Sequence, residues 1–215
     1  MCIRDRPHTC TTLDERRVEV KPGERIQILG KAGAGKSTLF RALASMWPWG
    51  VGTIQLPPRE TMMFMPQKPY LPLGTLRAAV AYPADPGRFD DAVVRAALER
   101  VDLGHLVPAL DRTDRWDRQL ALDEQQRLAF ARLLLHAPRW VVLDEAISAL
   151  DDVHRRLLLS ICDRELAEAT LILLGREPVL DGFWTRTLHI IEHPDGPCLR
   201  AGAQPRVLQP AAALV

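Results

Sequence analysis

The nine residues from Gly30 to Thr38 restrict the fold of this chain more than any other segment. They read Gly-Lys-Ala-Gly-Ala-Gly-Lys-Ser-Thr and match the pattern G-x-x-x-x-G-K-[ST] at every fixed position. The preceding run, Arg25 to Leu29, alternates like a β-strand. Apolar residues then recur at helical spacing, at Leu39, Phe40, Leu43 and Met46. The sequence therefore predicts a strand, a glycine-rich turn and a helix, which is the context that a phosphate-binding loop requires.

The residue types of this segment suit a phosphate group. Glycines let successive backbone N–H groups turn inward as an anion-binding nest, and the helix N-terminus adds its partial positive charge. We expect Lys36 to reach the β- and γ-phosphates of a nucleotide and the Ser37 hydroxyl to hold Mg²⁺. A glycine-rich turn without a ligand is the alternative, and the complete motif disfavours it. The predicted nucleotide-binding residues are Gly30, Lys31, Ala32, Gly33, Ala34, Gly35, Lys36, Ser37 and Thr38.

A second chemical signal lies downstream, where the apolar run Val141 to Leu143 ends in Asp144 and Glu145. Ligands of parallel sheets collect at the C-terminal ends of the strands. We therefore predict that Asp144 binds Mg²⁺, directly or through water, and that Glu145 polarises an attacking water. In isolation, two acids after a strand could instead cap the next helix. Beside a phosphate-binding loop, the metal and base interpretation is favoured.

The order of elements predicts an α/β fold with a parallel sheet. Met62 to Met65 and Trp140 to Leu143 are short apolar runs that indicate buried strands, as is Leu171 to Leu174. Helical spacing occurs between Asp90 and His136 and again after Asp151. Strand, helix, strand, a helical insert, then strand, helix, strand is an α/β order. The apolar residues expected on helix faces are Val93, Ala97, Leu98, Val101, Leu128, Ala131, Leu135, Val153, Leu157 and Ile161.

Composition excludes several classes of protein. The formal net charge is +1, so no overall field draws the chain to nucleic acid. The apolar runs are far shorter than the roughly 20 residues of a membrane-spanning helix. The cysteines show neither a C-x-x-C pair nor metal-ligand spacing, which argues against a zinc site. They are Cys2, Cys10, Cys162 and Cys198.

Together these motifs resemble the nucleotide-binding domain of an ABC transporter, from about Val18 to about Leu188. Pro66-Gln67 is similar to the Q-loop of that family, Leu120 to Arg127 lies at the signature position, and Ser148 to Asp151 matches the D-loop. One branch is especially similar: the peroxisomal acyl-CoA half-transporters and their bacterial relatives, including peptide and vitamin B12 importers. The segments that carry this likeness are Leu39 to Arg41, Trp47 to Gly50 and Pro69 to Arg77.

The resemblance implies an ATP hydrolase with an α/β P-loop NTPase core and an inserted α-helical subdomain. It implies that Glu145, Gln67 and Lys36 act in catalysis, and that Ser37, Gln67 and Asp144 bind Mg²⁺. The expected partners are ATP, a second nucleotide-binding domain in a head-to-tail dimer and a membrane domain, with no nucleic acid. The expected location is the cytoplasmic face of the inner membrane, although this fragment alone is expected to be soluble.

The resemblance also divides the chain. We expect residues 18–66 and 139–192 to form the nucleotide-binding core and residues 67–138 to form the helical subdomain. Residues 1–17 fit no part of the family pattern, which suggests a truncated or foreign start, and residues 193–215 are expected to be an irregular tail. The family usually stacks adenine on an aromatic side chain upstream of the phosphate loop, but no Phe, Trp or Tyr precedes Phe40. We therefore expect either that the first strands are lost or that the base is bound weakly.

Two departures from the family pattern predict weakened chemistry. The signature L-S-G-G-Q is replaced by Leu120-Ala121-Leu122-Asp123-Glu124. Ala121 lacks a hydroxyl for the partner's γ-phosphate, and Asp123 brings a negative charge towards it. Alternatively, Asp123 and Gln126 form an ordinary N-terminal capping box. Arg176 occupies the position at which the family pattern has its switch histidine, so we expect slowed ATP hydrolysis.

These departures leave three hypotheses. The first is a transport ATPase domain. The second is a non-hydrolysing or weakly hydrolysing ATP-binding module that regulates or pairs with an intact cassette. The third, an ABC ATPase of DNA repair or translation, ranks last. The spacing between Lys36 and Leu120 leaves no room for a long coiled-coil insertion, and the chain holds one cassette.

Overall fold

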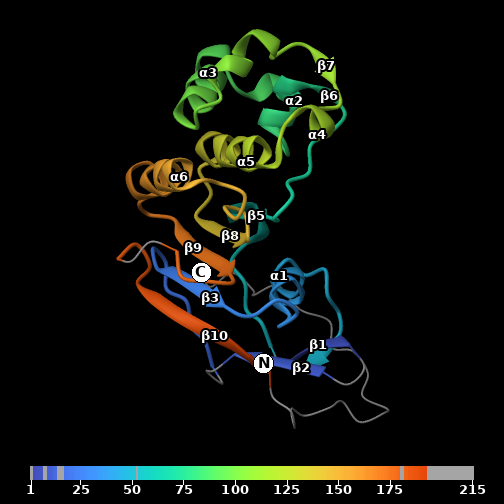
Figure 1. Cartoon of the computed structure of the whole chain (residues 1–215), viewed down its shortest axis with the longest axis vertical. Helices are drawn as coiled ribbons and strands as arrows, with labels where there is room; N and C mark the ends of the chain where they lie inside the picture. The colour runs from blue at the N-terminus through green and yellow to red at the C-terminus, as the bar shows by residue number, and fades with distance from the viewer. Residues whose placement is uncertain (1, 7–8, 14–16, 52, 180–181, 193–215) are drawn as a thin grey trace. The chain divides into compact units, whose positions relative to one another are not determined.

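The structure is a computed structural model that describes two compact units (Figure 1). The described residues are 2–6, 9–13, 17–51, 53–179 and 182–192. The first unit comprises the described parts of Met1–Phe64, Arg139–Glu145 and Thr170–Val215. The second comprises Met65–Pro138 and Ala146–Ala169. The expected tail, 193–215, lies outside the described residues.

A parallel sheet forms the centre of the first unit, as the sequence predicted. Its neighbouring strands run in the order β10, β3, β9, β8, and all adjacent pairs among these four are parallel. The strands are β3 (Arg25–Leu29), β8 (Trp140–Asp144), β9 (Thr170–Gly175) and β10 (Arg186–Glu192). Asp144 is level with Leu174 in this register, so the predicted carboxylate does lie at the C-terminal end of its strand.

Further strands extend this sheet on both sides. On the β10 side, β2 (Thr9–Leu13), β1 (Cys2–Arg6) and β4 (Gly50–Val51) continue it through antiparallel pairs. On the other side, β5 (Met62–Met65) follows β8 in the strand order. Within the described residues the sheet therefore has eight strands.

Helix α1 (Lys36–Leu43) packs its apolar face on this sheet. Leu39 and Phe40 are buried with strand residues such as Ile26, Val142 and Leu174. Burying one such side chain stabilises a fold by about 1.5–3 kcal/mol. Met46, which we expected on the same face, is 62% exposed. The helix ends at Leu43, and Ser45 turns into the left-handed region with φ 60°, so the helical phase does not reach Met46.

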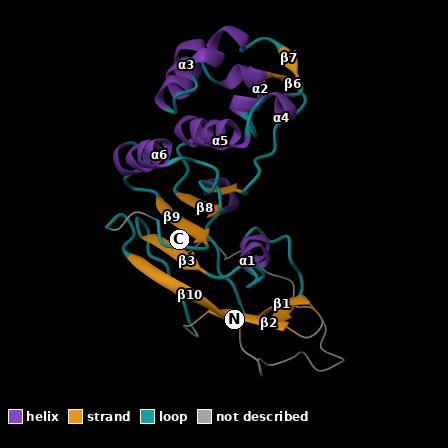
Figure 2. Ribbon diagram, viewed as in Figure 1, coloured by secondary structure: helices purple, strands orange, loops and turns teal. Residues whose placement is uncertain are grey.

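The second unit is mainly helical (Figure 2). Its α-helices are α2 (Leu76–Ala81), α3 (Asp91–Arg100), α4 (Trp116–Gln119), α5 (Leu122–His136) and α6 (Asp152–Arg164). Two 3₁₀ turns, η2 (Pro86–Arg88) and η3 (Gly104–Ala109), and the short strands β6 (Gly74–Thr75) and β7 (Thr113–Asp114) connect them. In the first unit, η1 (Arg59–Thr61) precedes β5.

Two residues that were predicted on buried helix faces are exposed. Val93 is 49% exposed and Val153 is 74% exposed. The buried stripe of α3 continues from Val94 through Ala97 and Leu98 to Val101, at the spacing i, i+3, i+4, i+7. Val93 and Val153 both lie in the first turn of their helix, before the first buried residue of that helix.

Residues 146–169 group with the helical unit, whereas we had expected them in the core. Within this unit, Arg100 of α3 forms an ion pair with Glu165, and His154 lies against Asp102.

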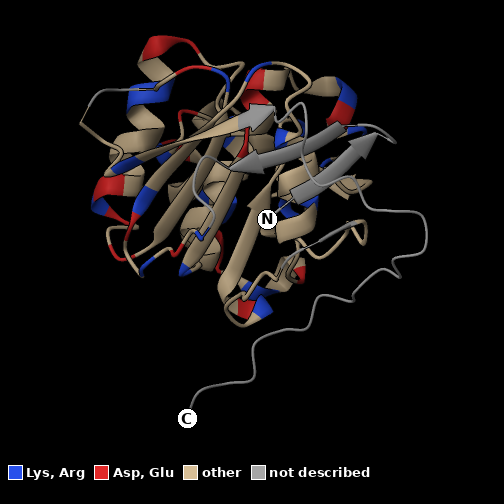
Figure 3. Ribbon diagram, turned by 90° about the horizontal axis from the view of Figure 1, so that it is seen from below, with Lys and Arg blue, Asp and Glu red and all other residues tan. Residues whose placement is uncertain are grey.

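None of the described helices is both long and apolar enough to cross a bilayer. Charges of both signs are scattered over helices and loops, while strands are drawn mostly tan (Figure 3).

Candidate functional site

The glycine-rich loop between β3 and α1 adopts a conformation that its residue types permit. Gly33 and Gly35 have φ values of 81° and 88°, a region that favours glycine. A Cβ atom on Gly30 would lie 3.2 Å from the Cβ of Ile190 and 3.3 Å from that of Ala34. Gly35 precedes the helix without a side-chain cap, so the N-terminal N–H groups of α1 have no side-chain acceptor at that position.

Lys36 holds its ammonium group inside this loop. Its Nζ donates to the carbonyl oxygens of Gly30 at 2.8 Å and Lys31 at 2.9 Å. The side chain is 5% exposed, and Nζ lies 3.5 Å from Glu145 Oε1. A buried cation surrounded by loop carbonyls and one carboxylate is placed where a phosphate oxygen can replace one of these partners.

The two side chains predicted to hold Mg²⁺ in the first unit lie in contact. The Ser37 hydroxyl forms a hydrogen bond with the Asp144 carboxylate. Burial raises the pKa of Asp144, while this hydrogen bond lowers it and the nearby charge of Glu145 raises it. Asp144 Oδ1 is buried with no hydrogen-bond partner among the described residues. A hydroxyl and an unsatisfied carboxylate oxygen are the donor types that Mg²⁺ prefers, so these residues fit the ion.

Glu145 follows β8 in a strained backbone conformation. Its φ is 49°, in the left-handed region that a non-glycine residue occupies at a cost of about 1–3 kcal/mol. Its N–H donates to the Leu174 carbonyl at 2.9 Å, which holds this turn in place. The side chain is only 12% exposed and accepts a hydrogen bond at Oε1. Strain of this kind, held by a neighbouring strand, is typical of functional positions.

Arg176 contacts this same carboxylate. Its Nε donates to Glu145 Oε1 at 3.0 Å, and its side chain is 60% exposed. Arg176 comes directly after β9, at the position where the family pattern has a histidine. The sequence left open whether an arginine could hold Glu145, and the structure has the two side chains paired.

Gln67 belongs to the second unit, where it joins two other motif segments. Its Nε2 lies 3.5 Å from Ser148 Oγ, and its backbone carbonyl accepts from Gln126 Nε2 at 2.9 Å. Gln126 is fully buried and also accepts from the Ala149 N–H at 3.1 Å. Sequence analysis missed this bridging role. The signal was available, because Gln126 is a polar residue two positions before Leu128, where the buried apolar run of α5 begins.

The signature segment begins α5 two residues earlier than the capping-box hypothesis predicted. Ala121 is the N-cap, and its N–H donates to Glu124 Oε2 at 2.9 Å. Asp123 is therefore not the cap, and that alternative was wrong. The carboxylate of Asp123 instead accepts from Arg127 Nη2 at 3.1 Å. Its negative charge is thus paired inside the second unit.

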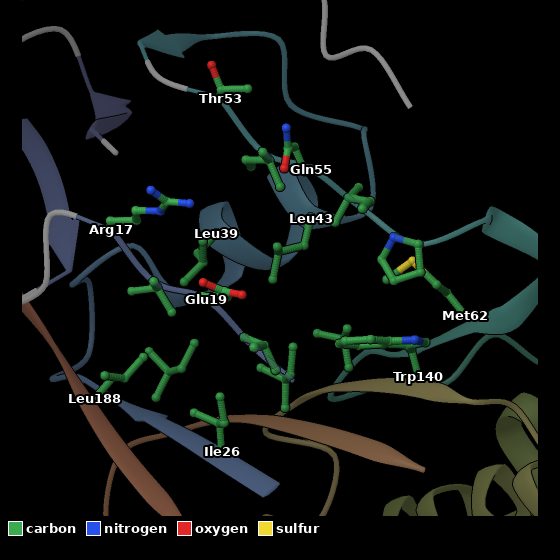
Figure 4. A pocket seen from close by; sticks show the side chains of 18 residues that line it. Arg17, Glu19, Ile26, Leu39, Leu43, Thr53, Gln55, Met62, Trp140 and Leu188 are labelled. Carbon is green, nitrogen blue, oxygen red and sulfur yellow. The ribbon is translucent and has the colours of Figure 1, made fainter. Parts of the chain in front are cut away.

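A cavity of about 720 Å³ lies in the first unit against the sheet and α1 (Figure 4). Apolar side chains such as Leu39, Leu43 and Trp140 form most of its wall, with Arg17 and Glu19 at one side. Lys36, Ser37 and Asp144 do not line it, so it is separate from the residues of the phosphate loop and its metal ligands.

A glycine-rich loop, a buried lysine and a hydroxyl–carboxylate pair, set between parallel strands and a helix N-terminus, define a P-loop nucleotide-binding protein. The family model described as ABC transporter matches residues 13–148. The chain belongs to this family, and it is an ABC ATPase domain that binds ATP.

Its relatives include both bacterial and eukaryotic transporters. An uncharacterized ABC transporter ATP-binding protein of Haemophilus influenzae is 37% identical over 83% of this chain and 29% of that protein. ATP-binding cassette sub-family D member 3 of Homo sapiens is 40% identical over 61% of this chain and 21% of that protein. A bacterial Atm1-family ABC exporter with ATP bound has a TM-score of 0.66 and 27% identity, over 78% of this chain and 34% of the exporter chain. This chain spans about a third or less of each.

Proposed function

We propose that this domain couples the binding and hydrolysis of Mg–ATP to transport by a membrane domain. The observation that carries the proposal is the contact set around the phosphate loop: Lys36 beside Glu145, Glu145 beside Arg176, and Ser37 beside Asp144. The membership of the chain in a transporter family supports the coupling to a membrane domain.

Each residue has a distinct role in this proposal. The backbone of Gly30–Thr38 and the ammonium of Lys36 bind the phosphates. Ser37 and Asp144 hold Mg²⁺, which neutralises charge on the phosphates when bound. Glu145 orients the attacking water and accepts its proton, and its contact with Arg176 fixes the carboxylate. Gln67 takes part in binding Mg²⁺ and in orienting the attacking water.

Two further partners belong to this proposal. A second cassette pairs head to tail, so that the first turn of α5 faces its nucleotide. A membrane domain contacts the segment after Gln67, where Tyr70 and Leu73 are 62% and 73% exposed. The buried Arg132 supports this segment by donating from Nη2 to the Tyr70 carbonyl at 2.9 Å. The location that follows is the cytoplasmic face of the inner membrane.

No finding favours the weakly hydrolysing alternative. Two of the residues that motivated it, Asp123 and Arg176, are both engaged in ion pairs within their own units. The alternative remains testable, because it predicts nucleotide binding without turnover.

Nucleotide binding by a Lys36→Ala variant tests the proposal. We expect fluorescent ATP analogue binding to weaken by at least about tenfold, because a buried charge-assisted contact to phosphate is lost. Lys21→Ala is the matched control, since it removes an exposed lysine near the same strand. Equal affinity in wild type and Lys36→Ala would refute phosphate binding by this loop. Omitting Mg²⁺ should remove phosphate release in the wild type.

A further inference from the structure

A chain of polar and charged side chains crosses the second unit from the start of α6 to the start of α5. Its first link is His154, whose Nδ1 lies 2.8 Å from Asp151 Oδ1 and whose Nε2 lies 3.1 Å from Asp102 Oδ2. Asp151 ends the turn that begins at Ser148, whereas Asp102 follows α3. His154 therefore stands between two carboxylates from separate segments.

Arg127 continues this chain to the signature segment. Its Nη1 donates to the Asp102 carbonyl at 2.6 Å and lies 3.5 Å from Asp102 Oδ2. Its Nη2 donates to Asp123 Oδ2 at 3.1 Å. The Arg127 side chain is 8% exposed, whereas its partners Asp102 and Asp123 are 69% and 37% exposed, so a buried guanidinium pairs with two carboxylates that reach the surface. Asp102 has a φ of 58°, which turns the chain sharply after α3.

Helix capping explains only part of this arrangement. Asp151 caps α6 by accepting from the His154 backbone N–H at 2.8 Å, and this bond does not need the imidazole. The contact from Nε2 to Asp102 lies outside the cap and reaches a residue 52 positions earlier in the chain. Local helix stability therefore does not account for the second carboxylate.

We propose that His154 is a positioning residue that couples the Ser148–Asp151 turn to the first turn of α5. Gln126 already joins α5 to this turn through Ala149. The chain through His154, Asp102 and Arg127 adds a second link, and two links fix the orientation of a helix start better than one. The inference rests on the proposed function in one respect: the first turn of α5 faces the partner cassette's nucleotide.

Two amide substitutions separate the contacts of the two imidazole nitrogens, Nδ1 and Nε2. In His154→Asn the amide stands near the place of Nδ1, so it can contact Asp151 and cannot reach Asp102. In His154→Gln the amide stands near the place of Nε2 and can still donate to Asp102. Asp102→Gly removes the other partner, and Gly adopts the positive φ of that position without strain. Asp152→Asn is the matched control, since it removes an exposed charge from the same turn of α6.

Hydrogen exchange of the nucleotide-free protein is the first measurement. We expect His154→Asn and Asp102→Gly to raise exchange at Leu120–Arg127 by about three- to fivefold, the loss expected for one partly exposed polar contact. His154→Gln and Asp152→Asn should leave that segment within about twofold of the wild type. A rise confined to residues 146–156 in His154→Asn would overturn the proposal, because it would assign His154 to the helix cap alone.

Steady-state ATPase kinetics of the same proteins are the second measurement. We expect kcat to fall about three- to fivefold in His154→Asn with KM within about twofold, and His154→Gln to recover most of it. The double variant with Asp102→Gly should lose no more than either single variant, since both break one link. Additive losses would overturn the coupling. If the wild type bound no ATP, the proposed function would fail, while the exchange experiment would still decide the coupling.

Discussion

Two helix N-termini in this molecule carry motif segments, and they are capped in opposite ways. Helix α1 begins after Gly35, has no acidic residue in its first turn and places Lys36 there. Helix α5 begins after Ala121, has Asp123 and Glu124 in its first turn, and Glu124 already accepts from the Ala121 N–H. Both helices start with unsatisfied N–H groups that attract anions.

This difference indicates which of the two helix N-termini can bind an anion from outside the chain. At α1 no side chain caps the helix start, so its partial positive charge is available to a ligand, and Lys36 adds a further positive charge. At α5 the Glu124 carboxylate already accepts from the N–H of Ala121 at the helix start. ATP binding to one cassette should therefore be robust, while closure against a second cassette should depend on a weaker surface. The four predictions that follow test this contrast.

Glu145→Gln should have the largest effect at the strong site. Hydrolysis should fall by about 10²–10⁴-fold, the range for loss of a general base, because the amide cannot accept the proton of water. Binding of a fluorescent ATP analogue should stay within about threefold of the wild type. Phosphate release and fluorescence titration measure the two effects. Unchanged hydrolysis would remove Glu145 from the reaction.

Ala121→Ser should strengthen the weak site. A serine at the N-cap can accept from the helix N–H groups, which stabilises a helix by about 1 kcal/mol. It also offers a hydroxyl to a partner's phosphate, worth about 1.5–3 kcal/mol. In a Glu145→Gln background we therefore expect ATP-dependent dimerisation to tighten by at least about tenfold, measured by analytical ultracentrifugation. Ala149→Ser is the control, because it makes the same substitution at a residue outside α5.

Asp144→Asn should trade metal binding for stability. Burial raises the pKa of Asp144, so the native state binds its proton more tightly than the unfolded chain does. Stability then falls as pH rises through the unfolded pKa, near 3.9, towards the raised folded pKa. The Asn variant lacks this loss, so its melting temperature without nucleotide should exceed that of the wild type at pH 7. The two should converge below about pH 4, and a lower Tm for the variant at pH 7 would contradict the burial argument.

Arg176→His should have the smallest effect. If Arg176 fixes Glu145 as the histidine of the family does, the exchange should change kcat by less than about threefold at pH 7. Arg176→Ala removes the contact and should lower kcat by about tenfold, since one charge-assisted hydrogen bond is lost. A His variant many-fold faster than the wild type would instead support the weakly hydrolysing alternative.

Sequence predicted the phosphate loop and the Asp144–Glu145 pair because their chemistry is local. Each side chain there acts within a few residues of a strand end, so the order of elements was enough to place it. The signature region resisted prediction because its contacts are long-range. Arg127 pairs with Asp102, and Gln126 reaches Gln67 and Ala149, from segments far apart in the chain.

Helix phase was the other source of error. Val93, Val153 and Met46 fit an apolar period but lie at or beyond helix ends. The helix starts at Asp90 and Asp151 were not assigned from the sequence, so the first buried position of each helix was not known. The positive φ of Glu145 was equally invisible, because it depends on its hydrogen bond to Leu174.

The pairing of Arg176 with Glu145 has a consequence for how quickly ATP arrives. Around the phosphate loop, Lys31, Lys36, Arg41 and Arg176 carry four positive charges against the two carboxylates of Asp144 and Glu145. A neutral histidine in place of Arg176 would lower this net charge from +2 to +1. The arginine thus makes the association of the polyanionic nucleotide faster, and more sensitive to ionic strength, than a histidine-bearing site would allow.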